Sequence, residues 1–380
     1  MPAPVPEPGS EQGVAGGHGR GHVQKNRRGK QESRERGATL DLMALPQSPT
    51  ASWPCPALAN AELASATTLN VGGRVEWLFE PTHPDQLVEA YRAAREKGYT
   101  PRILGGGANV ILPDGVLPGV VIATSRMSRV FRPRHPEVDP LAEDEDALAP
   151  VLPHLVGKHD PALAPDVQED PRLVAWAGLG LPGLVRATRL LGWSGLEGLV
   201  GVPGQLGGGV AMNAGGRWGD FWDVVESVRV LTPAGEVRHL ERDACQPRYR
   251  DGNLDGAIVL GACMRFEVST PAAVRARVQD FLAQKSAAQP LTERSSGCVF
   301  KNPSDEAAEG RSAGKLIEEC GCKGLARGGA LVSPKHANFI VNRGGATAQD
   351  VLGLIAEVRE RVADRTGIRL ELEVKIWKRD

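Results

Sequence analysis

The stretch from Gly195 to Asp220 constrains the fold of this chain more than any other. Ten of its 26 residues are glycine, so it cannot form a well-packed helix or strand. Glycine lets the backbone adopt positive φ and approach a ligand closely, at an entropic cost. A bound ligand explains such a loop better than packing does, and its amides would suit phosphate. A flexible linker is the alternative, but linkers contain more serine and less Val, Leu and Trp.

A second glycine run follows a short predicted strand over 100–104. It consists of Gly105, Gly106, Gly107, Ala108, Asn109 and Val110. Tight turns seldom need three consecutive glycines. The run therefore predicts another backbone cradle for an anion.

A third glycine pattern, Gly178-Leu-Gly-Leu-Pro-Gly183, lies between a predicted strand and a predicted helix. Formally this is the dinucleotide-binding fingerprint. A Rossmann unit would continue into a second strand that ends in an acidic residue. Here the helix leads into the long glycine loop instead, which argues against a Rossmann dinucleotide-binding unit.

Apolar periodicity predicts a mixed α+β chain. We expect strands over 71–79, 100–104, 110–112, 120–122, 173–177, 224–231, 237–240, 257–266, 339–342 and 369–377. We expect helices over 86–97, 184–191, 271–286, 313–320 and 348–366. In the last strand, alternation places Glu371, Glu373 and Lys375 on the face opposite Leu372, Val374 and Ile376.

Composition shifts divide the chain. Residues 1–60 lack any apolar period and predict a disordered tail. Residues 133–170 are rich in Pro, Ala and acids, which indicates a solvated insertion loop. After the tail we expect one ordered unit over 61–285, which contains the insertion loop, and then a compact α+β domain over 286–380.

Charge and cysteine content exclude several classes of protein. The formal net charge of −1 gives no global reason to expect nucleic acid as a partner. No apolar run reaches the roughly 18 residues that a transmembrane helix needs, so we expect no membrane association. The six cysteines are scattered, which predicts neither a disulfide framework nor a metal site. A reducing, cytoplasmic setting fits best.

Chemically active side chains gather in the C-terminal third. The segment 294–303 contains Cys298, Lys301 and Asn302, and His336 and Glu373 follow. Considered singly, each has an ordinary structural interpretation: a small buried hydrophobe for Cys298, a core histidine for His336, and a solvated strand face for the glutamates. Tyr249 and Arg250, further upstream, could form a surface cation–π pair.

Seven segments in order change that assessment. They are Leu104-Gly-Gly-Gly-Ala-Asn-Val110, the run Gly195–Gly204, Asn213-Ala-Gly215, Tyr249-Arg250, Gly297–Pro303, His336–Asn342 and Leu372-Glu-Val374. In this order and spacing the chain resembles the UDP-N-acetylenolpyruvoylglucosamine reductases (the MurB family), flavoenzymes of bacterial cell-wall synthesis. The resemblance runs from about residue 65 to the C-terminus. The compact stretch after Asn302 is similar to the type II branch.

The resemblance implies three parts. Two subdomains over 61–285 would form a PCMH-type, vanillyl-alcohol-oxidase-like FAD-binding unit. The domain over 286–380 would bind the UDP-sugar, and its last strand would return to the first subdomain and bring in Glu373. The implied FAD-binding residues are Gly105, Gly106, Gly107, Ala108, Asn109, Val110, Gly201, Val202, Pro203, Gly204, Gly207, Asn213 and Gly215.

The resemblance also implies a reaction in which NADPH reduces UDP-N-acetylglucosamine enolpyruvate to UDP-N-acetylmuramate through FAD. Arg250 and Glu373 would stabilise the enol-like intermediate, and Cys298 would protonate the α-carbon. Tyr249, Lys301, Asn302 and His336 would bind the substrate. We expect a monomer.

Three positions depart from the family pattern. Cys298 replaces the usual serine proton donor, and an ordinary thiol pKa near 8.5 makes it a competent acid. Ala108 and Gly252 also stand where serine is common, and Gly252 puts the positioning of Arg250 in question. Two alternatives stay open: a flavin oxidase or dehydrogenase acting on another small molecule, and a nucleotide-sugar-binding protein that has lost its chemistry.

Overall fold

The structure is a computed structural model that describes residues 53–133, 141, 148–151 and 170–379. Most of the predicted tail and of the predicted acidic insertion lies outside the described residues. The five predicted helices correspond to α1 (Pro84–Glu96), α2 (Leu181–Leu191), α5 (Pro271–Ala288), α7 (Ala313–Glu319) and α8 (Ala348–Thr366). No described helix is both long and apolar enough to cross a bilayer.

The first sheet has the strand order β1-β2-β5-β3. Its strands are β1 (Ala57–Glu62), β2 (Arg74–Phe79), β3 (Arg102–Leu104) and β5 (Val116–Ala123). The β2–β5 and β5–β3 pairs are parallel, and β1 pairs with β2 in antiparallel fashion. The predicted tail over 1–60 is therefore wrong at its C-terminal end. The short segment ALANAE carries little apolar pattern, and it is ordered by its backbone ladder to β2.

Helix α1 follows β2. Pro84 begins it, and the His83 side chain accepts a hydrogen bond from the Asp85 amide at 3.2 Å, which satisfies one free donor of the first turn. The predicted apolar face of Leu87, Ala90, Tyr91 and Ala94 is buried. This confirms the amphipathic pattern.

The second sheet is antiparallel, with the order β13-β12-β14-β8-β6-β7. Its strands are β6 (Val130–Pro133), β7 (Leu148–Val151), β8 (Arg172–Trp176), β12 (Val225–Leu231), β13 (Val237–Glu241) and β14 (Ile258–Arg265). The predicted insertion loop over 133–170 is wrong at 148–151, because that segment pairs with β6. Pro150 favours a loop from sequence, but an edge strand such as β7 tolerates proline.

Short elements connect this sheet to its helices. They are β9 (Trp193–Ser194), η5 (Glu197–Leu199), α3 (Leu206–Ala211), β10 (Gly215–Gly216), β11 (Gly219–Asp220), η6 (Phe221–Asp223), α4 (Arg242–Cys245) and β15 (Glu267–Val268). Trp193, Phe221 and Trp222 are fully buried in the core that these elements share with α2. The long glycine stretch thus contains two short helices, whose Leu199, Leu206 and Val210 are buried in this core, and a partly exposed hairpin. The expectation that it forms no packed helix is wrong at α3.

The C-terminal region contains a four-stranded antiparallel sheet with the order β16-β19-β18-β17. Its strands are β16 (Arg294–Cys298), β17 (Ala326–Arg327), β18 (Ala330–Val332) and β19 (Phe339–Asn342), and α6 (Asp305–Ala308) precedes α7. Helix α8 begins with a capping box between Thr347 and Asp350 and ends at Gly367, whose φ is 74°. Both are standard helix boundary signals.

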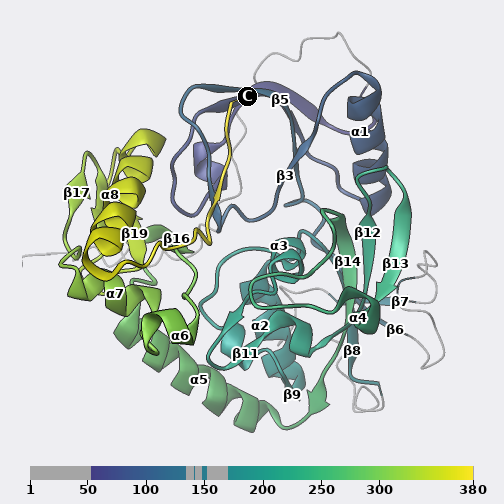
Figure 1. Cartoon of the computed structure of the whole chain (residues 1–380). Coiled ribbons are helices and arrows are strands. Elements are labelled where there is room, and N and C mark those ends of the chain that lie inside the picture. The colour runs from purple at the N-terminus through teal and green to yellow at the C-terminus, as the bar shows by residue number, and fades with distance from the viewer. Residues whose placement is uncertain (1–52, 134–140, 142–147, 152–169, 380) are drawn as a thin grey trace, which may run out of the picture. The chain divides into compact units, whose positions relative to one another are not determined.

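The chain end returns to the N-terminal part. Strand β20 (Lys375–Ile376) pairs in parallel with β4 (Val110–Ile111) (Figure 1). Strand β4 directly follows the glycine run at 105–109, which we call the first glycine loop. The continuous strand expected over 369–377 is wrong, since only two of its residues form a ladder. The amides of Glu373 and Val374 both donate to the Val299 carbonyl, at 2.8 and 3.3 Å. This bulge-like irregularity breaks the alternation of side chains.

Three further contacts join the C-terminal domain to the first sheet region. Thr68 Oγ1 donates to the Ser295 carbonyl at 2.6 Å. Asn342 Nδ2 donates to the carbonyl of Leu69 at 3.0 Å. The Asp114 carboxylate accepts from the first two amides of α8, Ala348 at 2.9 Å and Gln349 at 3.1 Å.

We predict that Asp114→Ala lowers the free energy of unfolding by about 1 kcal/mol, because it removes a cap from two free amides of a helix. Urea denaturation followed by circular dichroism measures the change. Asp364→Ala, at an exposed position within α8, is the matched control. Equal effects of the two substitutions would contradict a capping role.

Candidate active site

The first glycine loop leaves its backbone amides available. Among the described residues, none of the five amides from Gly105 to Asn109 donates a hydrogen bond. Gly107 has a φ of 60°, and a Cβ there would lie 2.1 Å from the Ala66 carbonyl oxygen. Only glycine fits this position. A row of free amides is the geometry of an anion-binding nest.

The second glycine loop, Gly201–Gly204, lies directly against the first. A Cβ on Gly106 would stand 2.7 Å from the Cα of Gly204, whose own φ is 113°. Thr124 Oγ1 donates to Gln205 Oε1 at 2.8 Å, which fixes the residue after Gly204. Glycines in both loops therefore allow two backbones to meet with no side chain between them.

Of the other candidate cofactor residues, Gly201, Val202 and Pro203 lead into Gly204 on the exposed side of the second loop, where Gly201 has a φ of 76°. Gly207 packs on Ala177, since a Cβ there would lie 2.9 Å from the Ala177 Cβ. Its amide also donates to the Ala177 carbonyl at 2.8 Å. Ala108 faces Gly204 at the contact between the loops.

The two candidate asparagines are engaged with the protein. Asn109 Nδ2 donates to the Glu373 carbonyl at 3.0 Å and lies 2.9 Å from the Met212 sulfur. Asn213 donates to the Arg248 carbonyl at 3.0 Å and accepts from the Trp222 amide at 3.1 Å. Their side chains thus shape the site, and Asn109 connects the first glycine loop to the returning C-terminal segment.

The structure brings Arg250 and Glu373 together. Arg250 Nε and Glu373 Oε1 are 2.8 Å apart, and each side chain is 14% exposed. Arg250 Nη2 donates to the Gly215 carbonyl at 2.8 Å, and Nη1 lies 3.5 Å from Asp220 Oδ1. In the described chain Nη1 is buried and has no hydrogen-bond acceptor.

Gly252 supports the turn that presents Arg250. Arg250 has a φ of 56°, which is uncommon for a side chain of this size. A Cβ on Gly252 would lie only 2.4 Å from the Val210 carbonyl oxygen, and the Gly252 amide donates to Ala211 at 3.0 Å. Glycine at this position therefore fits the packing and gives no reason to question the placement of Arg250.

Cys298 lies at the irregular end of β16, after Gly297 with its φ of 77°. It is the one cysteine of the six that is not fully buried. Burial raises the pKa of the Cys298 thiol to about 12, with a further increase from the Glu373 charge that Arg250 opposes. The ordinary thiol pKa expected from sequence is therefore wrong.

Glu373 feels the same surroundings. Burial raises the pKa of its carboxyl group, while the charges of Arg250 and Lys301 act in the opposite direction. The bulge at Val299 directs this side chain inward, whereas Glu371 and Lys375 are exposed. Sequence alternation alone would have left all three residues on one solvated face.

The candidate substrate residues are distributed unevenly. Tyr249 is 51% exposed, and its ring lies 4.9 Å from the Arg250 guanidinium carbon. Asn302 Oδ1 accepts from the Ala313 amide at 3.0 Å, so this side chain helps to begin α7. His336 packs edge-on against Phe339, and burial lowers the pKa of its imidazole.

Two residues of the site escaped sequence analysis. Asp220 pairs with Arg250 across the β10–β11 hairpin, and Met212 contacts Asn109. Both stand inside the long glycine stretch. Their residue types carry no chemical signal there, and only the fold shows what they contact.

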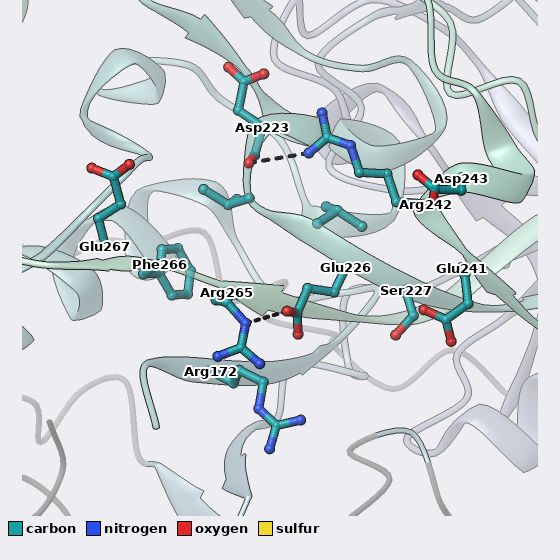
Figure 2. Close-up of a pocket in the computed structure, with 12 residues that line it drawn as sticks. Arg172, Asp223, Glu226, Ser227, Glu241, Arg242, Asp243, Arg265, Phe266 and Glu267 are labelled. Carbon is teal, nitrogen blue, oxygen red and sulfur yellow. Dashed lines mark hydrogen bonds and ion pairs between the residues drawn. The ribbon is translucent and has the colours of Figure 1, made fainter. Parts of the chain in front are cut away.

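A separate pocket opens between β12, β14 and the start of α4 (Figure 2). Arg265 pairs there with Glu226, and Arg242 Nη1 donates to the Asp223 carbonyl at 3.3 Å. Its lining includes none of the candidate site residues. Its lining residues are Arg172, Asp223, Val224, Val225, Glu226, Ser227, Glu241, Arg242, Asp243, Arg265, Phe266 and Glu267.

The comparisons with known proteins fit this geometry. The profile described as "FAD binding domain" matches residues 164–241, which include the second glycine loop. The free amides of Gly105–Asn109 suit the pyrophosphate of FAD. Together, the fold and the site define an FAD-dependent oxidoreductase.

The C-terminal domain identifies the family. The profile of the UDP-N-acetylenolpyruvoylglucosamine reductase C-terminal domain matches residues 289–377. The reductase of that name from Deinococcus radiodurans is 42% identical over 319 residues, which is 83% of this chain and 94% of that protein. The one from Moorella thermoacetica is 35% identical and covers 89% of this chain and 99% of its own length. The chain belongs to the UDP-N-acetylenolpyruvoylglucosamine reductase family.

A solved structure agrees. The crystal structure of this reductase (MurB) from Thermus caldophilus aligns with a TM-score of 0.63 and 31% sequence identity. The alignment covers 85% of this chain and 98% of the other. The α+β fold class and the flavin-binding architecture expected from the sequence are confirmed.

We predict that Cys298 in the folded protein resists alkylation by iodoacetamide until the pH exceeds about 10, because the thiolate is the reactive form and burial raises the thiol pKa. Mass spectrometry of the peptide containing Cys298 measures labelling against pH. The denatured protein, in which the same peptide should label with an ordinary thiol pKa near 8.5, is the control. Half-maximal labelling near pH 8.5 in the folded protein would contradict the prediction.

Proposed function

We propose that this enzyme reduces UDP-N-acetylglucosamine enolpyruvate to UDP-N-acetylmuramate with NADPH, a step in the synthesis of peptidoglycan precursors. The observation that carries the proposal is the Arg250–Glu373 ion pair beside the Cys298 thiol. Residues 61–285 would hold FAD, and residues 286–380 would bind the UDP-sugar. Membership in the reductase family supports both assignments.

The two glycine loops would hold the cofactor. Gly105–Val110 would supply amides to the pyrophosphate, and Gly201–Gly204 with Gly207 and Gly215 would line the remainder of the cofactor. FAD bound there would supply the hydride chemistry between NADPH and the β-carbon of the enolpyruvyl group. The chain's own residues must then stabilise the negative charge at the neighbouring α-carbon and donate a proton to it.

Arg250 would stabilise the negative charge that develops at the α-carbon. Hydride addition at the β-carbon places negative charge on the α-carbon and its carboxylate. Charge-assisted hydrogen bonds to a carboxylate are strong, and Nη1 of Arg250 has no hydrogen-bond acceptor in the described chain. Glu373 and the Gly215 carbonyl hold the other two nitrogens. The donor is therefore oriented before substrate binds, as electrostatic catalysis requires.

Cys298 would donate the proton that the α-carbon receives. Its S–H bond breaks as a C–H bond forms at the α-carbon, and the thiolate regains a proton from water. With a pKa of about 12, the thiol is fully protonated at neutral pH. It is a weaker acid than a free thiol but still a stronger one than the hydroxyl of the usual serine.

The sugar nucleotide would be held by Tyr249, Lys301, Asn302 and His336. Lys301 lies close enough to the site for its charge to act on Glu373. Asn302 uses its oxygen to begin α7, so its NH₂ group is the part offered to the ligand. We propose that the active unit is a monomer. All six cysteines are free, which supports a reducing, cytoplasmic setting.

We predict that the purified protein shows flavin absorption bands and that anaerobic NADPH bleaches them. The same titration with NADH tests the preference for NADPH. Flavin that bleaches with NADPH but is not reoxidised by the UDP-sugar enolpyruvate would favour a flavin oxidoreductase with another substrate. Absence of flavin after incubation with FAD would favour a binding protein without redox chemistry.

We predict that Cys298→Ala leaves flavin reduction by NADPH unchanged but slows reoxidation by the substrate by about 10²–10⁴-fold, the usual contribution of a positioned acid. Stopped-flow absorbance separates the two half-reactions. Cys298→Ser, which restores a proton donor of similar size, should retain much of the reoxidation rate. Reoxidation at the original rate in the alanine variant would remove Cys298 from the mechanism.

A further inference from the structure

Lys285 is a buried cation that the proposed mechanism does not use. It lies in the last turn of α5 and is 8% exposed. Its Nζ donates to the Gly198 carbonyl at 2.6 Å and to the Val200 carbonyl at 3.0 Å. Both carbonyls belong to the turn around η5 that begins the second glycine loop. Figure 1 shows α5 as the long helix that precedes the C-terminal sheet.

Among the described residues, the charge of Lys285 has no ion-pair partner. Its Nζ is held by backbone carbonyl groups rather than by a carboxylate, and burial lowers its pKa to about 8. Burial of an unpaired ammonium costs free energy, so a stability role alone would be filled better by methionine. The two carbonyl groups partly offset this cost, and they fix the position of the turn to which they belong.

Lys285 also reaches a hairpin, β10–β11, which contains Trp218 at its tip. Nζ lies 5.6 Å from the Trp218 ring centroid. The same ring stacks on Phe281 of α5, with centroids 5.0 Å apart. A Cβ on Gly198 would lie 2.5 Å from the Trp218 carbonyl oxygen. The tip of the hairpin, the turn and the helix therefore contact one another at Lys285.

The base of the same hairpin holds Arg250. Gly215 of β10 accepts the hydrogen bond from Arg250 Nη2, and Asp220 of β11 lies 3.5 Å from Nη1. The hairpin is only six residues long, so displacement of its tip moves its base. A second α5 contact, between Arg277 and Glu197 at 2.8 Å, holds the other side of the turn but does not reach the hairpin.

We propose that Lys285 is a positioning residue: by fixing both the Gly198–Val200 turn and the Trp218 hairpin, it holds the second glycine loop and the guanidinium of Arg250 in their working positions. This proposal rests on the proposed function for the role of Arg250. In this proposal, α5 holds the turn and the hairpin through Lys285 and then leads along the chain into β16, the strand that contains Cys298.

The test compares Lys285→Met and Lys285→Arg with the unchanged full-length protein. For Lys285→Met we expect reoxidation by substrate to slow by at least about tenfold, because small displacements of a positioned group are costly. Reduction by NADPH should change less. Lys285→Arg, which keeps the charge and the donors, should recover much of the loss. Lys335→Met is the control, since Lys335 also donates to an α5 carbonyl, that of Ser286, but contacts neither the turn nor the hairpin.

A second measurement does not depend on activity. Hydrogen exchange followed by mass spectrometry, on the protein without flavin, should show faster exchange over 195–220 in Lys285→Met and unchanged exchange in α8. Unchanged exchange over 195–220, or equal slowing of both half-reactions, would overturn the proposal. Lack of turnover in the unchanged protein would count against the proposed function instead. If Lys285→Met does not fold, Trp218→Leu, which removes the ring but keeps Lys285, should give the same kinetic pattern.

Discussion

The ion pair between Arg250 and Glu373 is the interaction on which the site depends. Its two residues are 123 positions apart in sequence, so it forms only when the C-terminal segment returns along β4 and the first glycine loop. The pairing of β20 with β4, the Asn109 hydrogen bond to the Glu373 backbone and the double acceptor at Val299 all serve this return. Without them, Glu373 would be an exposed residue of a terminal strand.

The glycines act through the same requirement for close approach. Gly106 and Gly204 allow two loops to touch, Gly107 approaches Ala66, and Gly252 approaches Val210. Each contact removes a side chain from a place where backbone must meet backbone. In the part of the chain that the structure describes, the amides from Gly105 to Asn109 have no acceptor, which leaves them available for the proposed contact with FAD. Under the proposed function, the same glycines serve both folding and cofactor binding, for two different reasons.

How far the sequence could predict these features depends on the range of the interactions. Helices with local signals, such as α1 with its N-terminal proline and α8 with its capping box, were predictable within a few residues. Strands β1 and β7 were not, because they are ordered by partners rather than by their own pattern. The candidate residues Arg250, Cys298 and Glu373 came from the resemblance. The pKa of Cys298, the pairing with Asp220 and the role of Lys285 arise from long-range packing, which no local pattern encodes.

Two cations, the partly buried Arg250 of the site and the buried Lys285 behind it, are held in different ways. Arg250 is balanced by Glu373 and Asp220, yet one of its nitrogens has no hydrogen bond in the described chain. Lys285 has no carboxylate and is held by two carbonyl groups and an aromatic ring. The first arrangement leaves Nη1 for an anion, whereas the second commits the lysine to backbone carbonyls and to the Trp218 ring. Lys285 contacts the tip of the six-residue β10–β11 hairpin, and Arg250 contacts its base. Under our proposal, the free energy lost by burying Lys285 is offset because the hairpin then holds Arg250 where Nη1 can bind an anion.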